Sequence, residues 1–236
     1  MNCFDIEQKC WNEQILQFGK KEVSYTKKGF IFLLKCGATD IDQKLQSAVP
    51  SETVVGKISP YWTERYSIPA ECQLVAATGD NPSSFAGLNI GPGEVCISLG
   101  TSDTVFMDMV NPRPQTEGHV FVNPVRKDSY MAMLCYKNGS LIRQKLRDEF
   151  KLSWEEFGNK LESTAPTGHL YIRFDYEEIT PALTGTWQFK VHNDKTMQAI
   201  EIEEGKKIRA LIETQIIAKR AHTIKVVVHI IVSLLF

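Results

Sequence analysis

One segment, residues 73–87, constrains the fold of this chain more than any other. Residues 74–77 form a continuous run of small apolar side chains, which is typical of a strand buried on both faces. Gly79 ends this run, and Asp80 or Asn81 is suited to cap a following helix. The proline that comes next suits the first helical turn. The segment therefore predicts a strand that leads through a tight turn into a helix.

A second segment predicts a hairpin. Two apolar runs, residues 95–98 and 104–107, flank the small residues Gly100, Thr101 and Ser102. Strands joined by so short a connection lie antiparallel. Glycine lets the backbone approach a ligand closely, and successive backbone N–H groups with two hydroxyls can cradle a phosphate. An ordinary hairpin turn explains the same residues, and both interpretations stay open.

Asp80 is the candidate for acid–base chemistry. Ligands of open α/β sheets gather at the carboxyl ends of the strands, where this carboxylate is expected. Phosphorylation of a sugar hydroxyl requires removal of its proton, which a carboxylate can accept. The alternative is that Asp80 only caps the helix.

The apolar pattern continues after the hairpin. Residues 119–122 and 130–136 are expected to extend its sheet. Ser153, followed three residues later by Glu156, is a capping box that predicts a helix start. Trp154, just inside that helix, is suited either to stack on an aromatic base or to pack against apolar side chains.

A long helix is predicted over residues 204–220, with Ile216 and Ile217 among the residues expected to face inward. The run 226–236 is strongly apolar but shorter than the roughly 20 residues of a membrane-spanning helix. It is interpreted as a buried strand without partners or as sequence foreign to the fold, with a tail anchor as a third alternative.

Composition excludes several functions. The net charge is −1 and the basic residues form no dense block, so we expect neither nucleic acid nor a membrane surface as a partner.

The six cysteines include no CxxC pair and have no histidine at zinc-like spacing, so no metal ligand is predicted. Such cysteines suit a reducing compartment, and with no signal-peptide pattern at the N-terminus we expect a cytoplasmic protein. The phosphate-binding patterns GxGxxG and GxxxxGK[ST] are absent from the sequence.

In these segments the sequence resembles the FGGY family of carbohydrate kinases. The resemblance rests on long ordered matches, which are far more specific than isolated triplets. They cover residues 75–87, 95–106, 117–125, 130–141, 179–181, 209–213 and 218–220.

The resemblance implies an α/β protein with the ribonuclease H/actin-like ATPase fold, here incomplete and with parts of both lobes. It also implies transfer of phosphate from ATP to D-xylulose, giving D-xylulose 5-phosphate, with Mg²⁺ as cofactor. In matching positions, Asp80 is implied as general base and sugar ligand, and Asn81 as a second sugar ligand. The turn 100–102 is implied as a phosphate loop and Trp154 as part of the adenine pocket.

The resemblance covers roughly residues 39–222 and implies two lobes. Residues 1–92 are expected to end the sugar-binding lobe, with an atypical insert at 17–36. Residues 93–222 are expected to begin the nucleotide-binding lobe, and 223–236 form an atypical apolar tail. We interpret the chain as a central fragment or an aberrantly spliced product of such a kinase.

Two other functions remain open. The chain is alternatively a non-catalytic fragment that binds or regulates the complete enzyme, because strand edges and an apolar tail favour association, including self-association. It is also interpretable as another kinase of the same family, acting on glycerol or on a different ketose.

Overall fold

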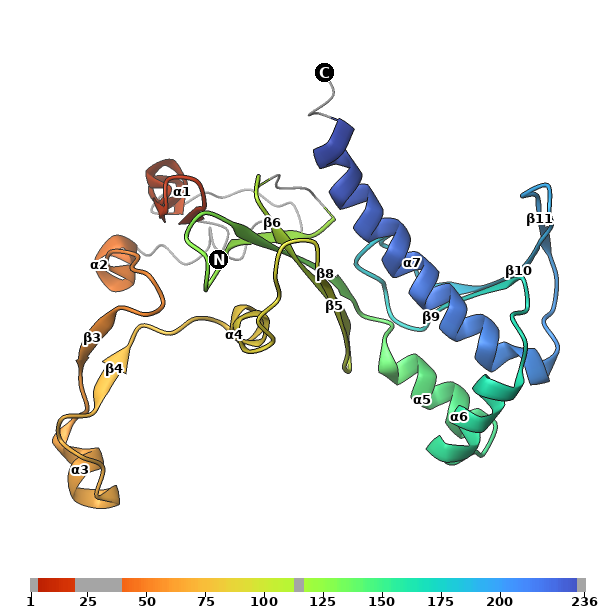
Figure 1. The fold of residues 1–236 in the computed structure, drawn as a ribbon, viewed down its shortest axis with the longest axis horizontal. Helices are drawn as coiled ribbons and strands as arrows, with labels where there is room; N and C mark the ends of the chain where they lie inside the picture. The colour runs from red at the N-terminus through yellow and green to blue at the C-terminus, as the bar shows by residue number, and fades with distance from the viewer. Residues whose placement is uncertain (1–3, 20–39, 113–116, 233–236) are drawn as a thin grey trace. The chain divides into compact units, whose positions relative to one another are not determined.

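The computed structural model describes residues 4–19, 40–112 and 117–232 and divides the chain into two units (Figure 1). The first comprises Met1–Asn89 and Phe121–Ser129, and the second comprises Ile90–Val120 and Tyr130–Phe236. The assignment of the chain to two lobes that meet at residues 92 and 93 stays a prediction. Most of the predicted insert at 17–36 lies outside the described residues.

The first unit contains short helices and antiparallel pairs of strands. Its elements, in chain order, are β1 (Phe4–Asp5), β2 (Cys10–Trp11), α1 (Glu13–Gly19), α2 (Ile41–Leu45), β3 (Val54–Lys57), α3 (Pro60–Tyr66), β4 (Gln73–Val75) and α4 (Asp80–Gly87). β1 pairs with β2, and β3 pairs with β4. Figure 1 shows β3 and β4 as a narrow ribbon with α3 at its end.

The strand that the sequence predicts to be buried is exposed. β4 forms a two-stranded ribbon with β3, and every residue of both strands is exposed. In the part of the chain that the structure describes, nothing covers either face of this ribbon, so its small apolar side chains face solvent. The helix that follows is confirmed: α4 begins at Asp80, and Gly79 rather than Asp80 is its N-cap.

The second unit is built on an antiparallel sheet with the strand order β5-β6-β8-β7. The elements after α4 are β5 (Val95–Leu99), β6 (Asp103–Met109), β7 (His119–Val122), β8 (Tyr130–Tyr136), α5 (Ser140–Glu149), α6 (Trp154–Ser163), β9 (His169–Phe174), β10 (Gly185–Val191), β11 (Met197–Ala199) and α7 (Glu204–Val232). The predicted hairpin and its continuation into further strands are confirmed. β9, β10 and β11 form a separate antiparallel sheet.

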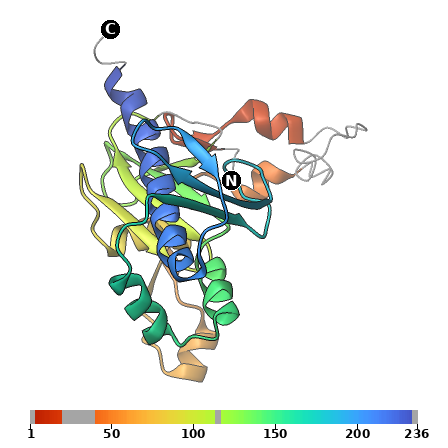
Figure 2. The ribbon, with the colours of Figure 1, turned by 90° about the vertical axis from the view of Figure 1, so that its right-hand side faces the viewer.

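A hydrophobic core joins α7 to α5, α6 and β9. Figure 2 shows α7 alongside the strands of the β9–β11 sheet. The buried residues of this core are Ile142, Leu146, Phe157, Tyr171, Ile202, Ile208, Ala210 and Leu211. The predicted capping box at the start of α6 is also confirmed: the Ser153 hydroxyl accepts from the backbone N–H of Glu156, and the Glu156 carboxylate accepts from the backbone N–H of Ser153.

The interpretation of the C-terminal tail as a strand is wrong, because α7 continues through it to Val232. Once begun at Glu204, the helix gains one backbone hydrogen bond for each added residue. Val226 is buried against the apolar side chains of β6 and β8.

The prediction that Ile216 and Ile217 of α7 face inward is wrong, because their side chains are 41% and 53% exposed. Among the described residues, α7 included, no helix combines the length and the apolar character that crossing a membrane requires.

Candidate functional site

Asp80 lies where the chain turns from β4 into α4. The turn starts at Ala77, whose left-handed backbone (φ 61°) is uncommon for a residue with a side chain. Oδ1 of Asp80 accepts a hydrogen bond from the backbone N–H of Asn81 at 2.8 Å. Asp80 is exposed and Asn81 is half-buried. A carboxylate placed here stabilises the positive end of the helix and is also free to accept a proton from a bound hydroxyl.

The candidate phosphate loop connects β5 to β6. Gly100, Thr101 and Ser102 follow Leu99, which pairs with Asp103 across the hairpin. The backbone N–H of Ser140, the first residue of α5, donates to the carbonyl oxygen of Gly100 at 3.2 Å. The turn therefore lies beside the N-terminus of α5, where backbone N–H groups and the helix dipole favour an anion.

Trp154 is the first residue of α6 and is 51% exposed. The guanidinium carbon of Arg147 lies 4.4 Å from the centroid of its indole, and the ring of Phe157 meets it edge-on at 5.6 Å. Arg147 belongs to the last turn of α5, a helix of 10 residues. Trp154 and the 100–102 turn thus lie at opposite ends of α5, about 15 Å apart along its axis.

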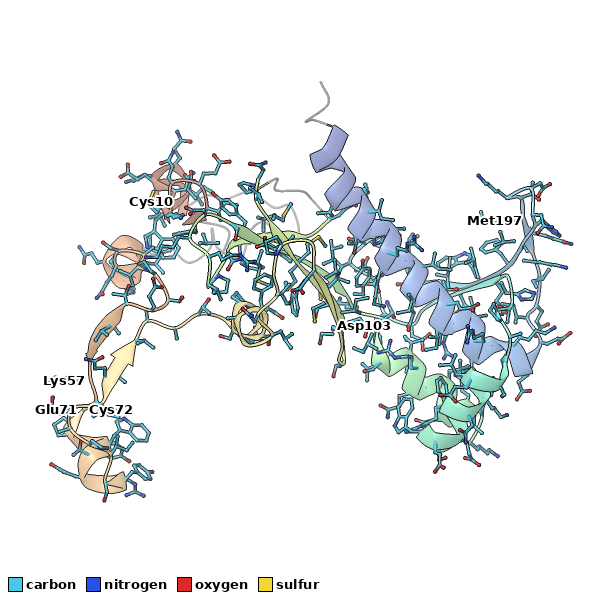
Figure 3. All side chains as sticks on the ribbon, viewed as in Figure 1. Cys10, Lys57, Glu71, Cys72, Asp103 and Met197 are labelled. Atoms are coloured by element: carbon cyan, nitrogen blue, oxygen red, sulfur yellow. The ribbon has the colours of Figure 1, made fainter. Side chains whose placement is uncertain are left out.

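A buried ion cluster that the sequence does not predict lies directly behind the turn. Asp103, labelled in Figure 3, is 0% exposed at the start of β6. Nη1 and Nη2 of Arg143 donate to its Oδ2 and Oδ1, each at 2.8 Å. Nζ of Lys219 lies 2.7 Å from the same Oδ2. The carboxylate therefore links the hairpin to α5 and α7.

The surroundings favour the ionised form of Asp103. Burial opposes ionisation of Asp103, but the hydrogen bonds from Arg143 and Lys219 outweigh it and hold the pKa of Asp103 below its usual value. Burial lowers the pKa of Lys219, and the bond to Asp103 offsets this only in part. Gln215 extends the cluster, since its Oε1 accepts from Nη1 of Arg143 at 2.8 Å.

A second buried carboxylate, Glu178, fixes the chain between β8 and α5. It is 3% exposed and accepts hydrogen bonds from the backbone N–H groups of Lys137 and Asn138. Its Oε2 also accepts from Nδ2 of Asn138 at 3.0 Å. The segment that leads into α5 is thus held by side-chain contacts on the buried side.

Gly139 is required by close packing, and its replacement gives a direct test of that packing. An added Cβ would lie 2.6 Å from both the backbone N and Oδ1 of Asp103. Gly139→Ala is therefore expected to lower the free energy of unfolding by about 1–3 kcal/mol. Gly158→Ala is the control, because nothing lies within 4 Å of the added carbon and the change favours helix α6. Urea unfolding followed by circular dichroism measures both, and a neutral Gly139→Ala variant would contradict the close contact.

A cavity of about 350 Å³ lies between β9 and the middle of α7. Apolar side chains such as Leu170, Trp187 and Leu211 line most of it, together with Lys219 and His222. None of the six predicted site residues lines this cavity. The predicted site residues therefore lie outside this cavity: Asp80 and Asn81 belong to α4 of the first unit, whereas the 100–102 turn and Trp154 lie at the two ends of α5 in the second unit.

His222 is expected to make the stability of the second unit sensitive to pH. Its Nδ1 lies 3.1 Å from the hydroxyl oxygen of Tyr136. Burial lowers the pKa of His222; Glu117 and Glu178 oppose this shift, and Lys225 adds to it. The unfolded chain then binds the proton more readily, so this contribution to stability is complete above the unfolded pKa of about 6.5 and is lost as the pH falls through the folded value.

We expect the free energy of unfolding to fall between pH 7.5 and pH 5.5, and to fall less in His222→Gln. Glutamine keeps a hydrogen-bonding group near Tyr136 and removes the titration. Urea unfolding at the two pH values measures the difference, and equal losses in both proteins would show that His222 does not contribute.

The described residues contain no group of three or more His, Cys, Asp or Glu side chains placed to hold a metal ion. The roles predicted for Asp80, Asn81, Trp154 and the 100–102 turn stay predictions at this point.

Comparison with known sequences gives long matches. Residues 95–225 match the C-terminal domain of the FGGY family of carbohydrate kinases. A xylulose kinase of Mus musculus is 43% identical over 225 residues, which cover 94% of this chain and 37% of that protein. Xylulose kinase 2 of Arabidopsis thaliana is 36% identical over 236 residues, covering 94% of this chain and 39% of that protein. The chain thus spans less than half the length of the relatives it matches.

Solved structures share the fold. A xylulose kinase from Rhodospirillum rubrum has a TM-score of 0.61 at 16% identity, covering 75% of this chain and 36% of that chain. A Plasmodium falciparum glycerol kinase with ADP has a TM-score of 0.58 at 15% identity, covering 90% of this chain and 39% of that chain. The α/β fold is therefore that of the FGGY sugar kinases, of the actin-like ATPase type and partial relative to them, as expected from the sequence.

Proposed function

Because the chain belongs to the FGGY family of carbohydrate kinases, we propose that it forms part of a kinase that transfers phosphate from ATP to D-xylulose. The observation that carries this proposal is the 43% identity to a mouse xylulose kinase over 94% of the chain. The products are D-xylulose 5-phosphate and ADP. The proposal concerns the portion of such an enzyme that this chain represents, since it spans 37% of that relative.

Asp80 is proposed as the general base and, with Asn81, as a ligand of the sugar. Its carboxylate takes the proton of the attacking hydroxyl, the sugar oxygen forms a bond to the γ-phosphorus, and the bond between that phosphorus and the β–γ bridging oxygen breaks to release ADP. The exposure of Asp80 supports this role, because the second oxygen of its carboxylate is open to a ligand.

Gly100, Thr101 and Ser102 are proposed to hold the ATP phosphates. The hydrogen bond from Ser140 to Gly100 supports this assignment, because it places the turn at the positive end of α5. Trp154 is proposed to line the adenine pocket, so that a bound nucleotide runs alongside α5 from the turn to the indole.

Mg²⁺ is proposed to enter with ATP, whose phosphates it neutralises when bound. A complex of that kind needs only one or two protein carboxylates. It is therefore compatible with the described residues, which hold no larger cluster of metal ligands.

We also propose that residues 1–92 belong to the sugar-binding lobe and residues 93–222 to the nucleotide-binding lobe, with 223–236 as an additional tail.

We propose that the protein is cytoplasmic. Cys10, Cys72, Cys96 and Cys135 are free thiols, which supports a reducing compartment.

A second function, binding to a complete kinase without catalysis, is favoured by one observation. The apolar residues Val54, Val55, Leu74 and Val75 of the β3–β4 ribbon are 44–58% exposed. Exposed apolar residues on strand edges favour association with another chain.

The two functions are separated by measuring ADP release in the presence of D-xylulose, other ketoses and glycerol. The kinase proposal expects turnover with D-xylulose that Asp80→Ala abolishes. Equal background rates in both proteins would exclude catalysis by this chain and favour the binding role. Faster turnover with glycerol or another ketose would replace D-xylulose as the substrate.

A further inference from the structure

The 100–102 turn ends at a residue whose backbone and side chain are both fixed. Gly100 and Thr101 are exposed, whereas the next residue after the turn, Asp103, is completely buried. Asp103 pairs with Leu99 across the hairpin and with Tyr136 of β8 on its other side. An exposed turn thus leads directly into a buried carboxylate.

Both ends of the turn are attached to the same helix, α5. The carbonyl oxygen of Gly100 accepts from the backbone N–H of Ser140, and the carboxylate of Asp103 accepts two hydrogen bonds from Arg143. A bidentate bond of this kind allows the carboxylate only one orientation relative to the guanidinium. Lys219 of α7 holds the same carboxylate from a second helix.

The start of α5 has little freedom to move away from the turn. Gly139 packs so closely on Asp103 that no Cβ fits between them. Glu178 holds the preceding residue, Asn138, through its backbone N–H and its side-chain amide. The N-terminus of α5 and the turn are therefore fixed relative to each other by buried polar contacts.

We propose that Asp103 is the positioning residue of the nucleotide phosphate loop. It holds the 100–102 turn on the N-terminus of α5, so that backbone N–H groups of both segments are directed at the same phosphates. Asp103 acts through the turn and does not touch the nucleotide. The inference rests on the proposed function, which assigns this turn to ATP.

The test uses the full 236-residue chain and two variants. The first variant combines Asp103→Asn with Lys219→Met. It removes the carboxylate that holds the turn on α5. Because Arg143 is then the one cation of the cluster left without a carboxylate, the double variant folds more readily than Asp103→Asn alone. Asp175→Asn is the matched control, because Asp175 also accepts from an arginine and a lysine, Arg173 and Lys145. Circular dichroism establishes folding. Hydrogen exchange of a peptide covering residues 98–104 reports the order of the turn, and calorimetric titration measures binding of ATP and of tripolyphosphate.

We expect faster exchange in the turn of the double variant and binding of both ligands that is weaker by about tenfold or more, with neither change in Asp175→Asn. A folded double variant with the parent's exchange or the parent's affinity would overturn the inference. If the parent chain binds neither ligand, the assignment of the turn to ATP fails, and Asp103 cannot position a nucleotide loop. Faster exchange in the double variant would then still show that Asp103 orders the turn.

Discussion

Asp103→Asn is expected to lower the free energy of unfolding by about 3–5 kcal/mol, the usual cost of removing one partner from a buried ion cluster. The carboxylate is 0% exposed and serves two cations, Arg143 and Lys219, which are 9% and 2% exposed. Asparagine keeps the shape of aspartate and loses its charge. Both cations then stay buried without a counterion, and the amide presents N–H groups where an acceptor is needed.

Urea unfolding of the parent and the variant measures this loss. Asp175→Asn, the control, is expected to cost about 1 kcal/mol or less, because Lys145 is 43% exposed and Arg173 keeps a second carboxylate partner, Glu149. Restoring part of the stability with Lys219→Met in the Asp103→Asn background would identify unpaired charge as the cause. Equal losses at Asp103 and Asp175 would contradict this account.

The contribution of this cluster to stability is lost at low pH. The pKa of Asp103 is lowered in the folded state, so its contribution to stability is present above the unfolded value of about 3.8 and is lost as the pH falls through the folded pKa. The effect of Asp103→Asn should therefore shrink below pH 4.

Asp80→Asn is expected to reduce D-xylulose-dependent ADP release by about 10²–10⁴-fold, the usual contribution of a general base. Asparagine retains the size of the side chain and can no longer accept a proton. The apparent KM for ATP should stay nearly unchanged, because the proposed phosphate loop is formed by other residues. Initial rates at saturating D-xylulose and varied ATP give kcat and the KM for ATP separately.

Asp128→Asn is the control for charge, since Asp128 is an exposed aspartate that the structure also assigns to the first unit. We expect its turnover to match that of the parent. An Asp80→Asn variant that turns over substrate as fast as the parent, at a rate clearly above background, would remove Asp80 from the mechanism while leaving the family assignment in place.

Local patterns in the sequence predict the local structure well. The hairpin around Gly100 follows from two apolar runs and a short turn, and the start of α6 follows from the spacing of Ser153 and Glu156. In both cases the residues that decide the structure are only a few positions apart. The family, and with it the fold, follows from the long ordered matches.

Burial is predicted less well, because it depends on partners that are distant in the sequence. The small apolar residues of β4 predict a covered strand, but its described partner is β3 alone. The apolar tail predicts a strand, whereas the helix that precedes it simply continues. In both segments the side chains are apolar, but whether they are covered depends on residues elsewhere in the chain.

The ion cluster is not predicted for the same reason, although the sequence contains a signal for it. Leu211, Gln215 and Lys219 are four residues apart and therefore share one face of α7, whose first member is buried. A polar and a charged residue on such a face indicate a buried partner. Nothing in the spacing identifies Asp103 as that partner, since the two helices and the hairpin meet only in the folded chain.

The attachment of the 100–102 turn to helices far along the chain also bears on the order of folding. Asp103 and Arg143 are 40 residues apart, and Arg143 and Gln215 are 72 residues apart. Closing loops of this length costs chain entropy before the contacts form. During synthesis the hairpin leaves the ribosome well before α7 does, so its carboxylate cannot contact Lys219 until that helix has docked. The turn therefore reaches its final shape only after α7 has been synthesised, which delays the assembly of the proposed phosphate loop until that helix has docked.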